Sequence, residues 1–112
     1  MRVAVVGGRD RNDFGFIKGV LDAFVKQDDV IVSGGAVGVD SFAEEYARKR
    51  GIKTSVFRPT YDNPSIVKPE LARNKMIVID SDIVLAFPAD NSKGTWNTIQ
   101  HAKLAGKRFI VF

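Results

Sequence analysis

Three glycine-rich segments with cationic or hydroxyl side chains beside them are the parts of this sequence that could do chemistry. The first contains Gly7, Gly8 and Arg9, the second runs over residues 33–40, and the third over residues 88–98. Glycine lets the backbone approach a ligand closely, and the free N–H groups at a helix start favour an anion. The segments therefore predict a phosphate site, although any tight turn before a helix also needs glycine.

Several well-known sites are excluded by particular residues. A Walker-type loop needs a Gly-Lys-Ser/Thr order, whereas Lys93 and Gly94 stand in the reverse order. The dinucleotide fingerprint GxGxxG is absent, and Arg58 follows the third predicted strand where an acid would hold a ribose hydroxyl or accept a phosphoryl group. A serine nucleophile would lack a base, because the one histidine, His101, falls inside a predicted helix.

Apolar patterning predicts the elements that position these segments. Near-continuous apolar runs, typical of strands buried on both faces of a parallel sheet, lie at residues 3–6, 30–33, 53–57, 83–87 and 108–112. Helical spacing predicts four helices between them: one behind Asn12 or Asp13 as N-cap, one from Val39 to a stop at Gly51, one from Pro69 to Ile79, and one from Gly94 or Thr95 to Gly106. The order predicts a three-layer α/β fold with helices on both faces, and it places all three glycine segments at the carboxyl ends of strands, where such sheets bind ligands.

Composition narrows the function further. The 112 residues fit one domain, 1–112, and the absence of cysteine with a single histidine excludes disulfides, thiolate zinc sites and multi-histidine metal sites, so no structural metal is expected. No apolar run is long enough to span a membrane, and the first residues do not resemble an export signal, so we expect a cytoplasmic protein without a membrane partner. The net charge of +4 fits an anionic partner, or solubility alone.

The segments VVGGRDRND, IVSGGAVGVDSFAEEYARKRGI, ELARNKMI, DIVLAFP and GTWNTIQHAKLAGK occur in this order over nearly the whole chain. Together they resemble the SLOG superfamily, and most closely its small YspA-type members. That superfamily also includes the LONELY GUY phosphoribohydrolases and the DNA-processing proteins of natural transformation. The resemblance implies a Rossmann-like sheet of five parallel strands, ordered 3-2-1-4-5, that binds a nucleotide or a nucleotide-derived ligand.

The same resemblance, together with the glycine segments, supplies the expected site residues. Arg73 matches an arginine that the phosphoribohydrolases use near the ribosyl bond, so we expect it to be catalytic if the protein is an enzyme. Asp40 is expected to hold the second glycine segment through hydrogen bonds to its N–H groups. The full set expected to bind the ligand or its phosphate is Gly7, Gly8, Arg9, Ser33, Gly34, Gly35, Ala36, Gly38, Asp40, Asn74, Pro88, Lys93, Gly94, Thr95 and Thr98.

One departure from the family pattern separates the functional hypotheses. The hydrolases carry PGGxGTxxE, and here Thr98 stands at the position of the glutamate. We therefore expect a nucleotide sensor or carrier with no cofactor beyond a bound nucleotide. One alternative is a nucleoside monophosphate phosphoribohydrolase with its acid relocated, to Asp10 or Asp90. Another is a protein that binds single-stranded DNA, although no row of basic and aromatic residues marks a DNA-binding element.

Two aromatic residues and the last strand complete the expectations. Trp96 could stack on a base, and a place in the core is at least as good an interpretation; Tyr61, in the long segment 58–68, is the better candidate for exposed stacking. No helix follows Phe112 to cover the edge of the last strand, which favours a homodimer.

Overall fold

A computed structural model describes all residues, 1–112, and its five strands form one parallel sheet ordered β3-β2-β1-β4-β5. The strands are β1 (Arg2–Gly7), β2 (Val30–Ser33), β3 (Lys53–Val56), β4 (Ile83–Phe87) and β5 (Arg108–Val111). In the central pair, Val3 lies beside Ile83 and Gly7 beside Phe87. The strand order reverses between β1 and β4, which is the point where an open sheet of this kind leaves a crevice beyond its carboxyl ends. The expected fold class and strand order are confirmed.

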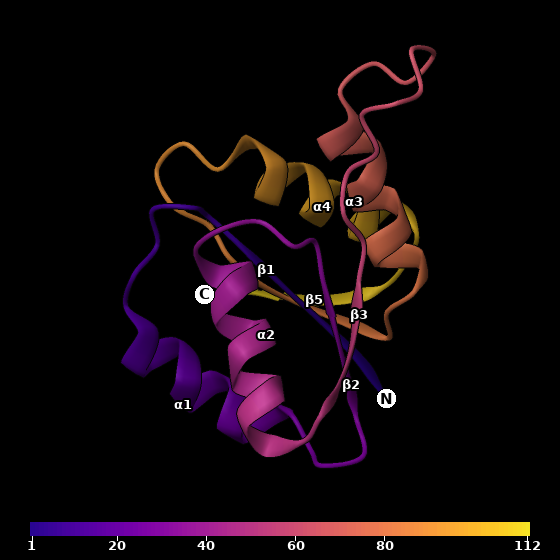
Figure 1. Ribbon diagram of the computed structural model, residues 1–112. Helices are drawn as coiled ribbons and strands as arrows, with labels where there is room; N and C mark the ends of the chain where they lie inside the picture. Colours follow the sequence, from indigo (N-terminus) through magenta and orange to yellow (C-terminus); the bar gives the residue numbers. More distant parts are fainter.

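Helices cover both faces of the sheet. They are α1 (Phe14–Phe24), α2 (Val39–Arg50), α3 (Pro69–Ile79) and α4 (Lys93–Leu104). Figure 1 shows α1 and α2 together on one face and α3 and α4 on the other, with the segment between β3 and α3 projecting away from the rest of the chain. The sheet therefore separates two layers of helices, and the chain changes layer only once, in the long connection from β3 to α3.

Each face of the sheet buries its own apolar cluster. On the side of α1 and α2, residues such as Val5, Leu21 and Phe87 belong to a cluster of 15 buried residues. On the side of α3 and α4, residues such as Val6 and Ile77 belong to a cluster of 9. Neighbouring β1 residues enter different clusters because successive strand side chains point to opposite faces. The near-continuous apolar runs in the sequence reflect this two-sided burial.

The end of α2 and the start of α1 lie at residues that the sequence predicts as helix boundaries. Gly51 follows α2 with φ of 67°, the left-handed conformation that glycine adopts without strain, so the expected helix stop is confirmed. Asp13 does stand before α1, but its side chain makes no capping hydrogen bond there; it forms an ion pair with Arg11 instead (Nε to Oδ1, 2.7 Å). The predicted N-cap position of α1 is therefore confirmed at Asp13, while the Arg11 guanidinium holds the carboxylate that could otherwise accept from the helix N–H groups.

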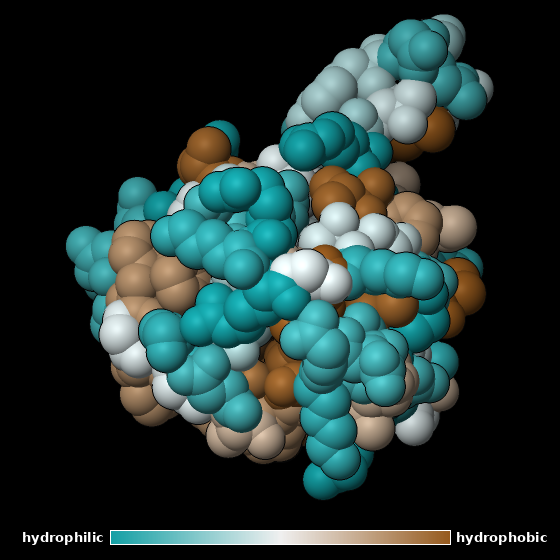
Figure 2. All heavy atoms as spheres, turned by 60° about the horizontal axis from the view of Figure 1, so that its bottom comes forward, coloured by the Kyte–Doolittle hydropathy of each residue, from teal (hydrophilic) through white to brown (hydrophobic).

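Other boundaries differ from expectation by one or two residues. The third and fifth strands end one residue earlier than expected, at Val56 and Val111, and α4 begins at Lys93. No helix has the length and apolarity needed to cross a bilayer. Figure 2 shows hydrophilic side chains over most of one face, with apolar groups scattered among them, and the β3–α3 segment standing out as a separate lobe.

Candidate functional site

A cavity of about 480 Å³ lies at the carboxyl ends of the strands. Val6 and Gly7 at the end of β1 form part of its wall, and the turns after β2 and β4 form others. The first turn of α3 and the segment before it complete the wall with Tyr61 and Glu70. A volume of this size lies within the range of natural small-molecule sites, and its place matches the crevice expected where the strand order reverses.

The structure brings most of the expected site residues to this one cavity, and three lie elsewhere. Ser33 is buried and donates a hydrogen bond from Oγ to Oε2 of Glu44 (2.8 Å). The Pro88 carbonyl accepts a hydrogen bond from Arg11 (3.1 Å). Gly38 packs against the turn after β1. The expected residues that do line the cavity are Gly7, Gly8, Arg9, Gly34, Gly35, Ala36, Asp40, Arg73, Asn74, Lys93, Gly94, Thr95 and Thr98.

Gly38 has a structural reason to be glycine. Its φ is 87°, and a Cβ built on it would lie 2.7 Å from the carbonyl oxygen of Gly8 and 2.7 Å from that of Arg9. A side chain at this position would strain the backbone and separate the turn after β2 from the turn after β1. Gly38 thus holds two of the glycine segments together, at a position away from the cavity wall.

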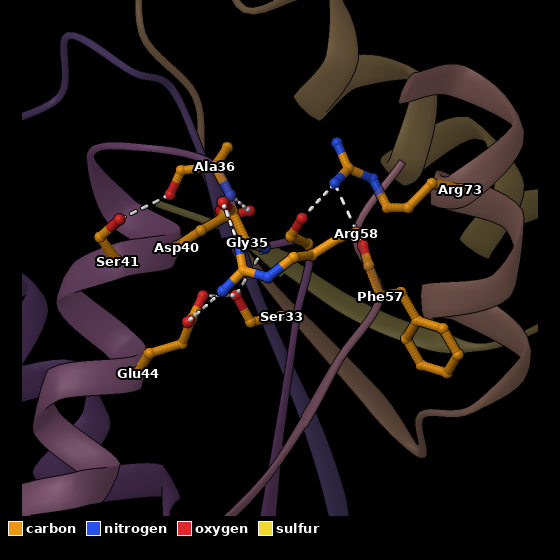
Figure 3. A network of polar contacts seen from close by, with 10 residues as sticks. Ser33, Gly35, Ala36, Asp40, Ser41, Glu44, Phe57, Arg58 and Arg73 are labelled. Atoms are coloured by element: carbon orange, nitrogen blue, oxygen red, sulfur yellow. Dashed lines mark hydrogen bonds and ion pairs between the residues drawn. The ribbon is translucent and has the colours of Figure 1, made fainter. Parts of the chain in front are cut away.

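The turn after β2 is closed by the protein's own side chains (Figure 3). The Gly35 amide donates to Ser33 Oγ (3.2 Å), and the Ala36 amide donates to Asp40 Oδ2 (3.3 Å). The expected role of Asp40, to hold this segment through its N–H groups, is present in the geometry. Because these donors are already satisfied, an anion at this turn would have to compete with a carboxylate.

Two arginines hold the carbonyl groups of the same turn. Arg73, on α3, donates from Nη1 to the Gly34 carbonyl and to the Phe57 carbonyl (3.2 Å for the latter), and from Nε to Asn74 Oδ1 (3.0 Å). Arg58 donates to the Gly35 carbonyl (3.1 Å), and both arginines lie around the turn in Figure 3. Arg73 has no carboxylate within ion-pair distance, so it adds positive charge to the cavity wall.

Asp40 is the buried titratable group of the site. Its residue is 4% exposed. Burial raises the pKa of Asp40 to about 6, against the opposing effects of the Ala36 amide and the charge of Arg73. At neutral pH the carboxylate is therefore ionised at an energetic cost, and it places a negative charge beside the turn after β2.

The turn after β4 leaves backbone N–H groups at the start of α4 without a partner in the chain, whereas the N–H groups of Gly35 and Ala36 in the turn after β2 are occupied. The Ser92 hydroxyl accepts from the Ala89 amide (2.6 Å) and does not cap α4, and the first turn of α4 contains no acid. The first α-helical hydrogen bond runs from the Trp96 amide to the Ser92 carbonyl (3.0 Å), so the amides of Gly94 and Thr95 precede it. These N–H groups and the positive end of the helix dipole are available to an anion.

Thr95 adds a side-chain donor to this helix start. The residue is 6% exposed, lines the cavity, and its hydroxyl makes no hydrogen bond to the chain. Thr98, at the position of the family glutamate, instead donates from Oγ1 to the Gly94 carbonyl (3.1 Å) and so supports the turn. Its hydroxyl cannot act as a carboxylic acid would, and a catalytic role for Arg73 stays a prediction.

Sequence reasoning missed one carboxylate in the cavity wall. Glu70, in the first turn of α3, lines the cavity and accepts a hydrogen bond from the Tyr61 hydroxyl (2.8 Å). An acid after Pro69 at a helix start is ordinary, so the sequence offered no signal that it faces a ligand site. Asp10 also lines the cavity, while Asp90 does not.

Of the two aromatic residues considered for stacking on a base, only Tyr61 lines the cavity. Tyr61 is 69% exposed and lines the cavity, so a ring is available there. Trp96 is 51% exposed and does not line the cavity, so it lies neither in the core nor at this site. The interpretation of Trp96 as a core residue was wrong: Thr95 and Thr98 of the same helix point inward, and Trp96 falls on the outer side.

Comparisons with known proteins identify a matching family and two similar solved structures. A family model described as YAcAr, the YspA, cpYpsA-related SLOG family, matches residues 1–63. DNA processing protein A from Helicobacter pylori, whose structure is described for its single-stranded DNA binding mode, is similar with a TM-score of 0.80 and 25% identity over 99% of this chain. No curated protein sequence matches the chain.

A second solved structure supports the fold alone. DNA processing protein A from Streptococcus pneumoniae is similar with a TM-score of 0.64 and 19% identity over 97% of this chain. The chain spans 64% of the length of the Helicobacter pylori structure and 58% of the Streptococcus pneumoniae structure.

Proposed function

The chain belongs to the YspA, cpYpsA-related SLOG family, and from that premise we propose that it binds a nucleotide or nucleotide-derived phosphorylated ligand in the cavity at the carboxyl ends of its strands, as a sensor or carrier. The family and the DNA-processing relatives support nucleotide or nucleic-acid binding at a general level. The finer proposal, a phosphorylated small molecule, depends on the chemistry of the cavity.

The start of α4 is the observation that carries this proposal. Two backbone amides without intrahelical partners, the unpartnered hydroxyl of Thr95 and the ammonium group of Lys93 all belong to this one helix start at the cavity. A phosphate is complementary to such a set, because it accepts several hydrogen bonds and carries charge that the helix dipole stabilises. The turn after β2 plays a different part in this proposal: it shapes the cavity and is held by Asp40 and Arg73.

Titration calorimetry with nucleoside mono- and diphosphates, nicotinamide adenine dinucleotide and ADP-ribose tests the proposal. The variants Thr95→Val and Lys93→Ala should weaken binding of the best ligand by roughly tenfold each, the effect of losing a hydrogen bond or ion pair to a charged group. Lys75→Ala is the matched control, because Lys75 is exposed on α3 and does not line the cavity. Absence of heat with every ligand at millimolar concentration, or equal affinities in all variants, contradicts the proposal.

Single-stranded DNA binding is the second candidate function. It is favoured by the 25% identity to the Helicobacter pylori protein over nearly the whole of this chain and by the net charge of +4. Against it, the cavity wall includes the carboxylates of Asp10, Asp40 and Glu70, which repel a polyanion. Fluorescence anisotropy with a labelled oligonucleotide at two salt concentrations decides: salt-sensitive binding tighter than that of any mononucleotide supports DNA over the first proposal.

A further inference from the structure

The cavity wall has a part that contains no glycine turn. It is formed by the segment after β3 and the first turn of α3, from which Tyr61 and Glu70 line the cavity. The Tyr61 hydroxyl donates to Glu70 Oε1 (2.8 Å), and this exposed hydrogen bond links the carboxylate to the segment before α3. This pair lies outside every glycine segment, and a phosphate at α4 does not require it.

Glu70 is ionised at neutral pH, and its neighbours use only some of the hydrogen-bond acceptor positions of its carboxylate. The backbone amide at the start of α3, followed by the Tyr61 hydroxyl, lowers the pKa of Glu70. A carboxylate has about four acceptor positions, and Tyr61 fills one of them at Oε1. The remaining positions accept hydrogen bonds, so they suit a hydroxyl or amino donor and repel a phosphate.

The charges around the cavity separate a place for phosphate from a place for hydroxyls. Lys93 and the open amides belong to the start of α4, while Glu70 belongs to the start of α3. Arg73 stands on α3 one turn after Glu70, and its positive charge acts on the carboxylates of both Glu70 and Asp40. A ligand that is anionic at one end and rich in hydroxyl groups elsewhere is complementary to this arrangement.

A ribose supplies that hydroxyl-rich part. In doubly wound sheets an acid near the carboxyl end of a strand accepts hydrogen bonds from ribose hydroxyls. Here Arg58, shortly after β3, stands where the pattern would place that acid, but α3 brings Glu70 to the same cavity. The exposed ring of Tyr61 offers a face on which a base can stack. Glu70 of α3 thus supplies to the cavity the acid that the sequence lacks after the third strand.

We propose that Glu70, held by Tyr61, is the specificity-determining residue that selects a ribonucleotide over the corresponding 2′-deoxyribonucleotide. This inference rests on the proposed function, because it requires that a nucleotide occupies the cavity. Losing a hydrogen bond between a hydroxyl and a carboxylate weakens binding by roughly tenfold or more. The wild-type chain therefore binds adenosine, guanosine, cytidine or uridine monophosphate at least about tenfold more tightly than the matching 2′-deoxy compound.

The test compares those pairs by titration calorimetry in the wild type and in four variants. In Glu70→Gln the ratio of the two dissociation constants falls to near one, chiefly because ribonucleotide binding weakens. In Tyr61→Phe, which leaves the first turn of α3 intact, the ratio falls part of the way. Glu45→Gln keeps the wild-type ratio, because Glu45 lies on α2 away from the cavity. Thr95→Val weakens both members of each pair equally.

The outcomes separate this inference from the proposed function. If the wild type binds both sugars equally while Thr95→Val weakens both, the role of Glu70 is overturned and the phosphate site stands. If Glu70→Gln lowers thermal stability but keeps the ratio, Glu70 only stabilises the start of α3, and the inference is again overturned. If nicotinamide adenine dinucleotide or ADP-ribose binds but no mononucleotide does, the role of Glu70 is overturned and the proposed function stands. If no nucleotide or nucleotide derivative binds, or if a DNA oligonucleotide binds more tightly than every one of them, both proposals fail.

Discussion

Arg73 of α3 donates a hydrogen bond to the backbone carbonyl of Gly34, at the end of β2. The two residues lie 39 positions apart in the chain and belong to opposite layers: α3 packs on one face of the sheet, and the turn at Gly34 leads into α2 on the other. The same guanidinium reaches the Phe57 carbonyl after β3. Arg73 therefore connects α3 to the carboxyl ends of two adjacent strands, β2 and β3.

Replacing Arg73 should destabilise this connection measurably. Arg73→Ala removes three hydrogen bonds, to Gly34, Phe57 and Asn74, and we expect a loss of about 1–3 kcal/mol in the free energy of unfolding. Arg73→Lys should recover only part of it, because an ammonium group lacks the planar fork that reaches separate acceptors. Urea unfolding measures both. Equal stability of Arg73→Ala and wild type would show that the contacts contribute nothing.

Asp40 should make the stability of the protein fall as pH rises between about 4 and 6. The folded state, with a pKa of about 6, holds a proton there that the unfolded chain, near 3.8, has released. A difference of about two pH units corresponds to about 3 kcal/mol, fully lost above the folded pKa. Asp40→Asn should therefore be stabilised relative to wild type by a margin that grows from pH 4 to 7.

Urea unfolding at several pH values checks this, with Asp62→Asn as the control because Asp62 is exposed in the segment before α3. The acids with lowered pKa, such as Asp22 and Asp29, make stability fall at lower pH, and they are present in both chains, so they cancel in the difference. A margin between Asp40→Asn and wild type that does not change with pH would contradict the expectation.

Two glycine substitutions should act in opposite directions. Gly38→Ala places a Cβ at a φ of 87° and 2.7 Å from two carbonyl oxygens, so we expect a loss of about 1–3 kcal/mol. Gly19→Ala lies in the middle of α1 with no atom near the new Cβ, and we expect a gain of about 0.5–1 kcal/mol. Thermal unfolding of the two variants side by side measures both. A Gly38→Ala protein as stable as wild type would remove the argument for that backbone.

Trp96 should report solvent and contribute little to stability. The residue is 51% exposed, so its fluorescence should be that of a hydrated indole and acrylamide should quench it readily. Trp96→Phe should change the free energy of unfolding by less than about 0.5 kcal/mol. Phe87→Ala provides the contrast, because Phe87 is fully buried and its truncation should cost about 3–5 kcal/mol. Blue-shifted, protected emission would place Trp96 in the core after all.

Local patterns predicted the sheet and most of the cavity wall because both depend on short-range rules. Buried parallel strands need continuous apolar residues, as in Ile83–Phe87, and the ends of neighbouring strands meet at one edge whatever the loops do. The position of residues 93–98 at that edge follows from the same rule. The expectation needed no knowledge of how distant segments touch.

Two features that sequence reasoning missed depend on the path of the long connection between β3 and α3. Whether Arg58 turns back to the Gly35 carbonyl, and whether Tyr61 meets Glu70, is decided by tertiary packing that no periodicity encodes. Asp13 stands at the N-cap of α1 as predicted, but its side chain makes no capping hydrogen bond. A neighbouring guanidinium took the carboxylate, and local propensity does not weigh that competition.

The unequal size of the two apolar clusters bears on how the molecule fluctuates. The smaller cluster anchors α3 and α4, and these helices bring Arg73, Glu70 and Thr95 to the cavity. A layer with less buried apolar surface opens at a lower free energy than its counterpart, so backbone amides of α3 and α4 should exchange with deuterium before those of the larger layer. An occupant spanning β1 and α4 would slow that exchange selectively, and its affinity would thereby be coupled to motion on one side of the sheet.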